Sequence, residues 1–173
     1  TVFLDEIVEV PTSIQTKLLR VLQDHEFERV GGTRTIRADI RVIAATNGDL
    51  ERAMREGRFR EDLYYRLNVV SLKLPPLRER KEDIPVLIEY FLRKYAGELK
   101  KPVKLLTPGT LDDLIAYHWP GNVRELENVI ERAMVLSTGE QIGPEDLPPQ
   151  VTAGPRRETF RGKEFHEAVK EFK

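Results

Sequence analysis

The sequence opens with a short apolar run that ends in two neighbouring carboxylates. Residues 2–4 are Val, Phe and Leu, which predict a β-strand buried on both faces, and Asp5 and Glu6 follow where such a strand should end. Two carboxylates at the edge of a core are costly unless a cation meets them. A hydrated Mg²⁺ would meet this need, because one carboxylate can hold the ion while the other polarises a water molecule. The same pattern also occurs where a strand simply runs out into solvent, so both interpretations stay open here.

Composition limits the classes of protein to which the chain can belong. Its 173 residues suit one domain, or one domain with a satellite, and 28 Lys and Arg against 29 Asp and Glu lack the strong positive charge of a non-specific nucleic-acid binder. The absence of cysteine excludes disulfides and thiolate sites and agrees with a reducing cytoplasm. No apolar run approaches the ~20 residues of a membrane span, so we expect a soluble protein with no membrane partner. Because Thr1 adjoins a core strand directly, we expect a piece of a longer protein.

A second predicted strand also ends in polar residues. Residues 40–47 predict another buried strand, closed by Thr46 and Asn47. The alternative is that these two side chains only cap the helix predicted over residues 49–56. A third strand is predicted over residues 69–74, before two prolines.

A helix and a turn are predicted between the first two strands. The helix begins near Thr12, which has the spacing of a capping box with Gln15. Two glycines within residues 27–33 predict the turn. The apolar stripe of the helix comprises Ile14, Leu18, Val21 and Leu22.

Basic residues are frequent before and after the third predicted strand. Residues 52–80 hold eight Lys or Arg against four Asp or Glu. An RNA-binding patch is one interpretation, but interleaved acids favour surface ion pairing or phosphate contact at particular points.

The second half of the sequence is predicted to be helical. Apolar residues at helical spacing run over residues 84–95, and a second helix begins after Thr107. A third helix begins at Asn122, where Glu125 completes a capping box. Trp119, just before it, is expected in the core.

Arg124 lies in the first turn of this third helix, where the macrodipole disfavours a cation. A phosphate bound at the same helix end would resolve the conflict. The alternative is an arginine that extends into solvent or pairs with an acid such as Glu127.

Several longer motifs occur in one order along the chain, and together they resemble a known family. Residues 1 to about 150 strongly resemble the central AAA+ ATPase domain of bacterial sigma-54-dependent transcriptional activators, the enhancer-binding proteins of the NtrC type. The motifs that carry the resemblance are Val2-Phe3-Leu4-Asp5-Glu6-Ile7, Arg29-Val30-Gly31-Gly32, Ile43-Ala44-Ala45-Thr46-Asn47, Phe59-Arg60-Glu61-Asp62-Leu63-Tyr64-Tyr65-Arg66-Leu67 and Trp119-Pro120-Gly121-Asn122-Val123-Arg124-Glu125-Leu126.

The resemblance implies roles in binding and hydrolysing ATP. Asp5 would coordinate Mg²⁺ as part of the Walker B motif, and Glu6 would orient the attacking water. Thr46 and Asn47 match sensor I, whose polar group senses the γ-phosphate.

The resemblance also assigns three arginines. Arg60 and Arg66 match the arginine fingers, which reach the nucleotide of the neighbouring subunit and offset transition-state charge there. Arg124 matches sensor II. In the family, a hexameric or heptameric ring uses ATP hydrolysis to remodel the complex of sigma-54 RNA polymerase with promoter DNA.

The sequence departs from the family in lacking two loops. It has no G-x-x-x-x-G-K-[ST] loop to hold phosphate and no GAFTGA loop to contact sigma-54. In the family both loops precede the Walker B strand, so we expect negligible ATPase activity from residues 1–173 alone.

The expected fold is α/β. Residues 1–80 would supply strands 3, 4 and 5 of the family sheet, whose order is 5-1-4-3-2, and residues 81–150 would form an all-helical lid. Residues 151–173 would be a linker and the start of a DNA-binding domain that is missing here, with an amphipathic helix from Phe165.

Two other functions compete with a ring ATPase. Residues 107–138 could be a helix-turn-helix, but five acids against two arginines make a poor surface for DNA. A non-catalytic interaction or oligomerisation domain could share the fold. The presence of Asp5, Glu6, Arg60 and Arg66 argues against a domain that has lost its catalytic residues.

Overall fold

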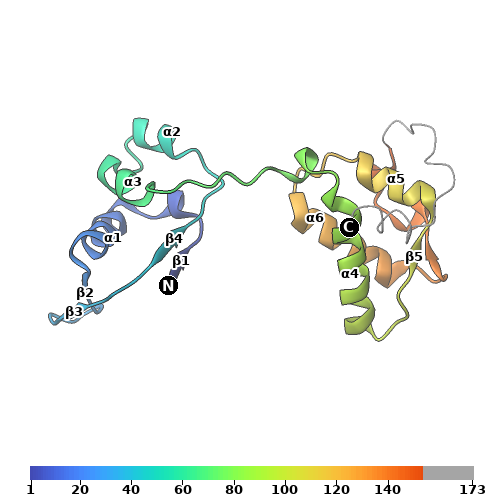
Figure 1. Ribbon diagram of the computed structural model, residues 1–173, viewed down its shortest axis with the longest axis horizontal. Helices are drawn as coiled ribbons and strands as arrows, with labels where there is room; N and C mark the ends of the chain where they lie inside the picture. Colours follow the sequence, from blue (N-terminus) through green and yellow to red (C-terminus); the bar gives the residue numbers. More distant parts are fainter. Residues whose placement is uncertain (154–173) are drawn as a thin grey trace. The chain divides into compact units, whose positions relative to one another are not determined.

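Residues 1–153 are described by the computed structural model, and they separate into two units (Figure 1). The first is Thr1–Lys73 and the second begins at Leu74, and each has its own hydrophobic core. The helix expected from Phe165 and most of the expected linker lie outside the described residues. Between residues 1 and 153, no helix has both the length and the hydropathy needed to cross a bilayer.

A parallel pair of short strands forms the main sheet of the first unit. β1 (Val2–Leu4) pairs with β4 (Val42–Ala44). The ladder continues beyond both strands, because the Ala45 N–H donates to the Leu4 carbonyl at 2.8 Å and the Ile7 N–H donates to the Ala45 carbonyl at 3.0 Å. The carboxyl ends of the two strands therefore meet at one edge of the sheet.

The expectation that these strands are buried on both faces is wrong. Phe3 exposes 61 % of its surface and Ile43 exposes 43 %. Both side chains suit a core, but no element among residues 1–153 covers them. An apolar run shows that its side chains are suited to burial. It does not show which other element covers them.

The third strand expected over residues 69–74 does not form within the described residues. The segment is irregular and pairs with no other strand, and its large apolar side chains are exposed. A strand exists only when a neighbour takes up its backbone hydrogen bonds. The β-propensity of residues 69–74 therefore predicted a strand, but no neighbouring strand among the described residues pairs with it.

Three helices and a 3₁₀ turn build the core of the first unit. They are η1 (Ile7–Glu9), α1 (Thr12–Asp24), α2 (Leu50–Arg55) and α3 (Glu61–Leu67), and α1 packs against α3. The helix expected over residues 49–56 is confirmed, and the Asp49 side chain caps it. The buried side chains of this core are Ile7, Val8, Leu19, Ala53, Phe59 and Leu63.

The capping box expected at the start of α1 is wrong. No side chain caps this helix, and Gln15 is fully buried, where its amide bonds to other segments. Ile14, which was expected on the buried stripe, is exposed, and Leu19 is buried instead. Gln15 can face the core because its amide has three hydrogen-bond partners there. A prediction from apolar residues alone cannot find such a position.

A hairpin separates α1 from β4. β2 (Glu26–Glu28) pairs antiparallel with β3 (Thr35–Arg37), so the expected turn begins only after Glu28. Gly31 has a φ of +75°, and the Gly32 N–H donates to the Arg29 carbonyl at 2.9 Å. The positive φ explains the glycine at this position.

The second unit is helical, as expected, and its two-residue strands were not predicted. Val151 is buried, so the helical unit continues past residue 150 into the stretch expected to be a linker. The stripe expected over residues 84–95 is confirmed, because most of its apolar side chains are buried. The elements are η2 (Leu77–Glu79), α4 (Asp83–Leu99), β5 (Leu105–Leu106), α5 (Pro108–Ala116), α6 (Asn122–Leu136), β6 (Gln141–Ile142), η3 (Pro144–Asp146) and α7 (Pro149–Thr152), with β5 and β6 parallel.

The capping box expected between Asn122 and Glu125 at the start of α6 is wrong. Glu125 accepts a hydrogen bond from the Gly121 N–H at 2.8 Å, and the Asn122 N–H donates to the Trp119 carbonyl at 2.8 Å. Asn122 instead has a φ of 53°, and its side-chain oxygen accepts from the Leu77 N–H at 2.9 Å. A partner 45 residues away thus outcompetes the local cap. Trp119 is fully buried, as expected.

We expect Trp119→Ala to lower the free energy of unfolding of the second unit by about 3–5 kcal/mol, because it opens a large cavity. It also removes the indole N–H that donates to the Leu114 carbonyl at 2.8 Å. Hydrogen exchange measured by mass spectrometry should show faster exchange in α4 and α6 and no change in α1. Tyr90→Ala is the control, because Tyr90 is 61 % exposed. Equal effects of the two substitutions would contradict a core role for Trp119.

Candidate functional site

The two carboxylates at the end of β1 lie in a sharp backbone turn. Asp5 accepts a hydrogen bond from the Glu6 N–H through its Oδ1 at 3.0 Å. Glu6 has φ 50° and ψ 48°, a left-handed conformation that costs a non-glycine residue about 1 kcal/mol. Ile7 and Val8, directly after it, are buried. The turn thus places a half-buried Glu6 beside an exposed Asp5.

The end of β4 meets the end of β1 through Asn47. Its side-chain Nδ2 donates to Glu6 Oε1 at 3.0 Å, and its backbone N–H donates to Glu6 Oε2 at 3.4 Å. Both oxygens of the carboxylate are therefore held by one residue. Thr46 makes no hydrogen bond to Glu6, and its hydroxyl accepts from the Gly48 N–H at 3.0 Å.

Gly48 allows the close packing behind this contact. A Cβ atom at this position would lie 2.8 Å from Cγ1 of Val8, closer than real contacts permit. Glycine therefore lets the chain after Asn47 approach η1, the turn that follows Glu6. The contact between Glu6 and Asn47 depends on that approach.

The carboxylates fit Mg²⁺ only together with another source of oxygen ligands. Among residues 1–153, no group of three or more His, Cys, Asp and Glu could hold a metal. Mg²⁺ in nucleotide sites uses one or two carboxylates, water and phosphate oxygens. Asp5 matches that pattern, because it is exposed and only its Oδ1 accepts a hydrogen bond.

Arg60 lies at the start of α3 and pairs with an acid on the same helix. Its Nε and Nη2 donate to the two oxygens of Asp62 at 3.0 and 2.7 Å. This hydrogen bonding raises the pKa of Arg60 and lowers the pKa of Asp62. Both residues line an open depression of about 490 Å³ together with Glu61 and Tyr65. The guanidinium is therefore presented at the surface.

Arg66 is held differently from Arg60. Its Nη2 and Nε donate to the Leu22 carbonyl at 3.1 and 3.3 Å. Leu22 lies in the last turn of α1, where carbonyls lack a partner within the helix. Within residues 1–153, no hydrogen bond or ion pair joins Arg60 or Arg66 to Asp5 or Glu6.

Arg124 lies in the first turn of α6 in the second unit, exposed and without a hydrogen bond or ion pair to residues 1–153. The expected alternative partner, Glu127, is engaged elsewhere: its Oε1 accepts from Lys94 at 2.7 Å and from the Tyr95 hydroxyl at 3.2 Å. The Lys94 contact lowers the pKa of Glu127. Burial, with the nearby Glu127 carboxylate, raises the pKa of Tyr95 to about 12.

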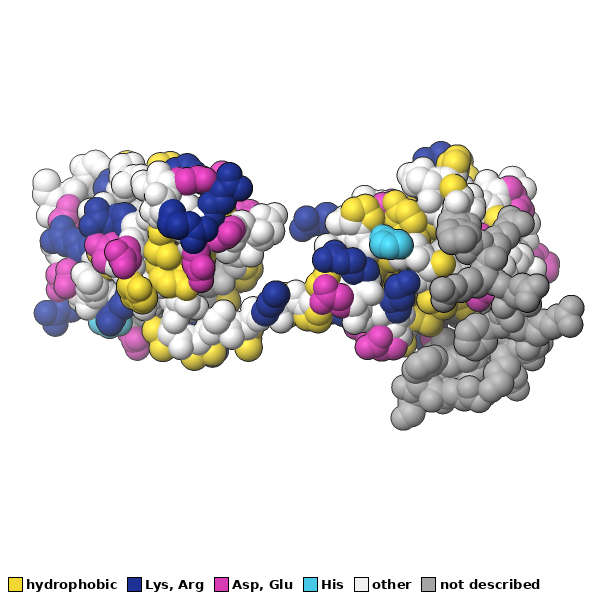
Figure 2. All heavy atoms as spheres, turned by 90° about the horizontal axis from the view of Figure 1, so that it is seen from above, with side chains coloured by type: hydrophobic (Ala, Val, Ile, Leu, Met, Phe, Trp, Pro, Cys, Tyr) yellow, Lys and Arg dark blue, Asp and Glu magenta, His cyan; other side chains and the backbone are white. Residues whose placement is uncertain are grey.

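Charges of both signs are interspersed over the surface. Figure 2 shows Lys and Arg side chains beside Asp and Glu on each unit, without a broad basic face in that view. Three arginines of residues 52–60, Arg52, Arg58 and Arg60, form ion pairs with nearby acids. This pairing agrees with the surface interpretation of residues 52–80.

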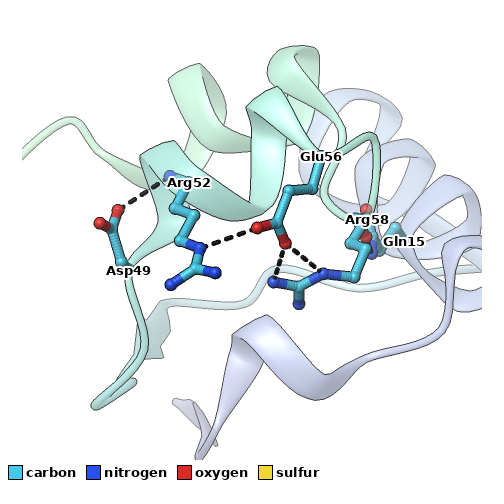
Figure 3. A network of polar contacts seen from close by, with 5 residues as sticks. All are labelled: Gln15, Asp49, Arg52, Glu56 and Arg58. Carbon is cyan, nitrogen blue, oxygen red and sulfur yellow. Dashed lines mark hydrogen bonds and ion pairs between the residues drawn. The ribbon is translucent and has the colours of Figure 1, made fainter.

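Gln15 is the residue of the site that sequence reasoning missed. It was assigned to a helix cap, yet its buried amide contacts the backbone on both sides of Phe59, at Arg58 and Arg60. Figure 3 shows Gln15 beside Arg58. The available signal was a polar residue within the apolar pattern of α1.

Two family models match the chain. The Sigma-54 interaction domain matches residues 1–73, and the AAA+ ATPase lid domain matches residues 78–163. These matches confirm the AAA+ fold class expected from the sequence. The chain belongs to the AAA+ domains of bacterial sigma-54-dependent transcriptional activators.

Individual relatives agree with this assignment. The chain is 56 % identical over 151 residues to the regulatory protein AtoC of Escherichia coli strain K12, covering 87 % of this chain and 33 % of that protein. It is 52 % identical over 162 residues to the transcriptional regulatory protein ZraR of Salmonella typhimurium, covering 94 % and 37 %. The chain thus spans about a third of the length of these relatives.

A solved structure shares the fold. The crystal structure of NtrX from Brucella abortus in complex with ATP matches with a TM-score of 0.84 and 39 % identity, over 98 % of this chain and 41 % of that chain. A second NtrX structure, in complex with ADP, matches with a TM-score of 0.83.

We expect Arg66→Ala to lower the free energy of local unfolding at the end of α1 by about 1 kcal/mol, because it leaves the Leu22 carbonyl without its charged donor. Hydrogen exchange in the last turn of α1 and the residues after it should become faster. Arg60→Ala is the matched control, since its partner Asp62 lies on the same helix at the surface and such pairs contribute little. Equal acceleration in both variants would show that the two arginines do not differ as described.

Proposed function

We propose that this chain supplies the hydrolytic and lid parts of a cytoplasmic AAA+ ATPase subunit that activates transcription by remodelling sigma-54 RNA polymerase at promoters. The observation that carries the proposal is the contact between Glu6 and Asn47 at the ends of two neighbouring parallel strands. Ligands of α/β sheets bind beyond the carboxyl ends of the strands. Family membership makes ATP the ligand to expect there.

Glu6 is the residue that polarises the attacking water. Asn47 donates two hydrogen bonds to its carboxylate, which fixes the orientation of the group and leaves further lone pairs to accept from water. Asp5 would hold Mg²⁺ through its exposed side, and the ion would supply charge neutralisation of the phosphates. Thr46 completes sensor I beside Asn47.

Arg60 acts on the nucleotide of a neighbouring subunit. Among residues 1–153, its exposed guanidinium pairs with no acid except Asp62, which supports a role in trans. A cation delivered in this way offsets transition-state charge, so hydrolysis depends on assembly into a hexameric or heptameric ring. Arg66, the second finger arginine, would first have to leave the Leu22 carbonyl.

Arg124 is the sensor II arginine. Its exposed position in the first turn of α6, without a partner among residues 1–153, suits contact with a phosphate. The names of AtoC and ZraR describe regulatory proteins, which supports the role in transcription. DNA binding through a C-terminal domain is part of the same proposal.

We expect ATP hydrolysis by the complete natural protein to rise cooperatively with protein concentration. Glu6→Gln should lower kcat by roughly 10²–10⁴-fold, because the amide cannot take up a proton from water. Arg60→Ala should lower kcat by roughly 10³-fold or more, because the charge in trans is lost. A steady-state phosphate-release assay measures all three proteins. If the complete protein neither binds nor hydrolyses ATP, a non-catalytic interaction or oligomerisation domain replaces the proposal.

The sigma-54 part of the proposal has a separate test. We expect the complete protein with ATP to convert the closed complex of sigma-54 RNA polymerase into an open one, measured by permanganate reactivity of unpaired thymines. A non-hydrolysable ATP analogue should not support the conversion, nor should Glu6→Gln. Polymerase carrying the housekeeping sigma factor is the control, and an equal effect on it would contradict the assignment of the partner.

A further inference from the structure

Gln15 is a buried amide whose hydrogen-bonding groups are used on three sides. Its side chain is 0 % exposed. Nε2 donates to the Val10 carbonyl and to the Arg58 carbonyl, both at 2.8 Å, and Oε1 accepts from the Arg60 N–H at 2.9 Å. Both amide hydrogens and one lone pair are therefore satisfied inside the protein.

These bonds join the two parts of the proposed chemistry within the first unit. Val10 directly follows η1, the turn that begins after Glu6. Arg58 and Arg60 lie just before α3, 43 and 45 residues from Gln15 in the sequence. One side chain thus connects the segment after the acid pair to the segment that carries the finger arginine.

The Arg60 end depends on Gln15 more than the Val10 end does. Gln15 Oε1 is the only acceptor of the Arg60 N–H among residues 1–153. The segment before Val10 has other anchors, because the Ile7 N–H donates to the Ala45 carbonyl at 3.0 Å and Ile7 and Val8 are buried. Loss of Gln15 therefore frees the backbone of Arg60 first.

A second set of contacts holds the same segment from the other side. The Arg58 side chain donates to Glu56 Oε2, and Arg52 donates to Glu56 Oε1 at 2.7 Å (Figure 3). Hydrogen bonds from these two arginines lower the pKa of Glu56. Phe59, between Arg58 and Arg60, is buried. The segment stays attached without Gln15, so loss of Gln15 alters the direction of Arg60 more than the fold.

We propose that Gln15 is the positioning residue for the finger arginine: it fixes the backbone from which Arg60 extends toward a neighbouring subunit. This inference rests on the proposed function, in which Arg60 acts in trans. A purely structural role would predict damage to the whole unit, including its own acid pair. A positioning role predicts a defect in what the subunit donates to its neighbour, with its own nucleotide site intact.

Gln15→Met tests the proposal, because methionine has similar length and no hydrogen-bonding amide. We expect kcat of the complete protein to fall by about 10²-fold with an unchanged KM for ATP, since misplacement of a catalytic group by about 1 Å has an effect of this size. Gln23→Met is the matched control, the same substitution on the exposed face of α1. Circular dichroism and light scattering check fold and assembly.

Mixing subunits separates positioning from other defects. Glu6→Gln subunits hydrolyse ATP very slowly but still present Arg60, so they should restore activity when mixed with Gln15→Met subunits. Arg60→Ala subunits present no finger, so they should not restore it. Recovery with Arg60→Ala, recovery with neither partner, or full activity of Gln15→Met alone would overturn the proposal.

The mixture of Glu6→Gln with Arg60→Ala is the reference. It should regain activity, because one subunit supplies the acid pair and the other supplies the finger. If this reference mixture stays inactive while the wild-type protein hydrolyses ATP, the arrangement in trans is wrong, and the role of Gln15 falls with it. If Gln15→Met does not fold, Gln15→Asn replaces it, since its amide keeps a polar group in the buried site but is one methylene too short to keep the bonds to Val10, Arg58 and Arg60 together. A partial loss of kcat, restored by Glu6→Gln and not by Arg60→Ala, is then expected, and any other pattern overturns the proposal.

Discussion

The parallel pairing of β1 with β4 is the constraint on which the candidate site depends. Because both strands run in the same direction, their carboxyl ends reach one edge of the sheet together. The ladder bonds between Leu4, Ala45 and Ile7 carry the pairing past the strands and into the turn that contains Glu6. Asn47 can then hold both oxygens of the Glu6 carboxylate. A shift of one residue in this register would turn the side chains to the opposite faces and separate the pair.

The two finger arginines show that similar sequence context can lead to different physical states. Arg60 is the N-cap residue of α3 and Arg66 lies within this short helix, six positions later in the sequence. Arg60 is held at its backbone by the buried Gln15, while its side chain stays at the surface with Asp62. Arg66 uses its side chain to satisfy a carbonyl at the end of α1. The first arrangement presents a cation, whereas the second uses a cation to hold two helices together.

The second unit provides a self-contained support for Arg124. Trp119 and the buried side chains of α4 and α6 form one core, which fixes the start of α6. Asn122 ties that start to η2 through the Leu77 N–H. Glu127 is occupied by Lys94 and Tyr95, so Arg124 has no acid partner in its own helix. The cation therefore remains at the surface at a helix end that favours anions.

Local sequence pattern determined the elements whose signals lie within a few residues. These include the long apolar periodicity of α4, the cap of α2 by Asp49, the buried Trp119, and the polar residues that close β1 and β4. Long-range contacts decided the rest. The strand expected over residues 69–74 does not form, because no neighbour among residues 1–153 takes up its hydrogen bonds. Gln15 and Asn122 leave their expected caps for backbone partners more than 40 residues away. A sequence can specify which groups must be satisfied, and only the tertiary structure decides which partner reaches them.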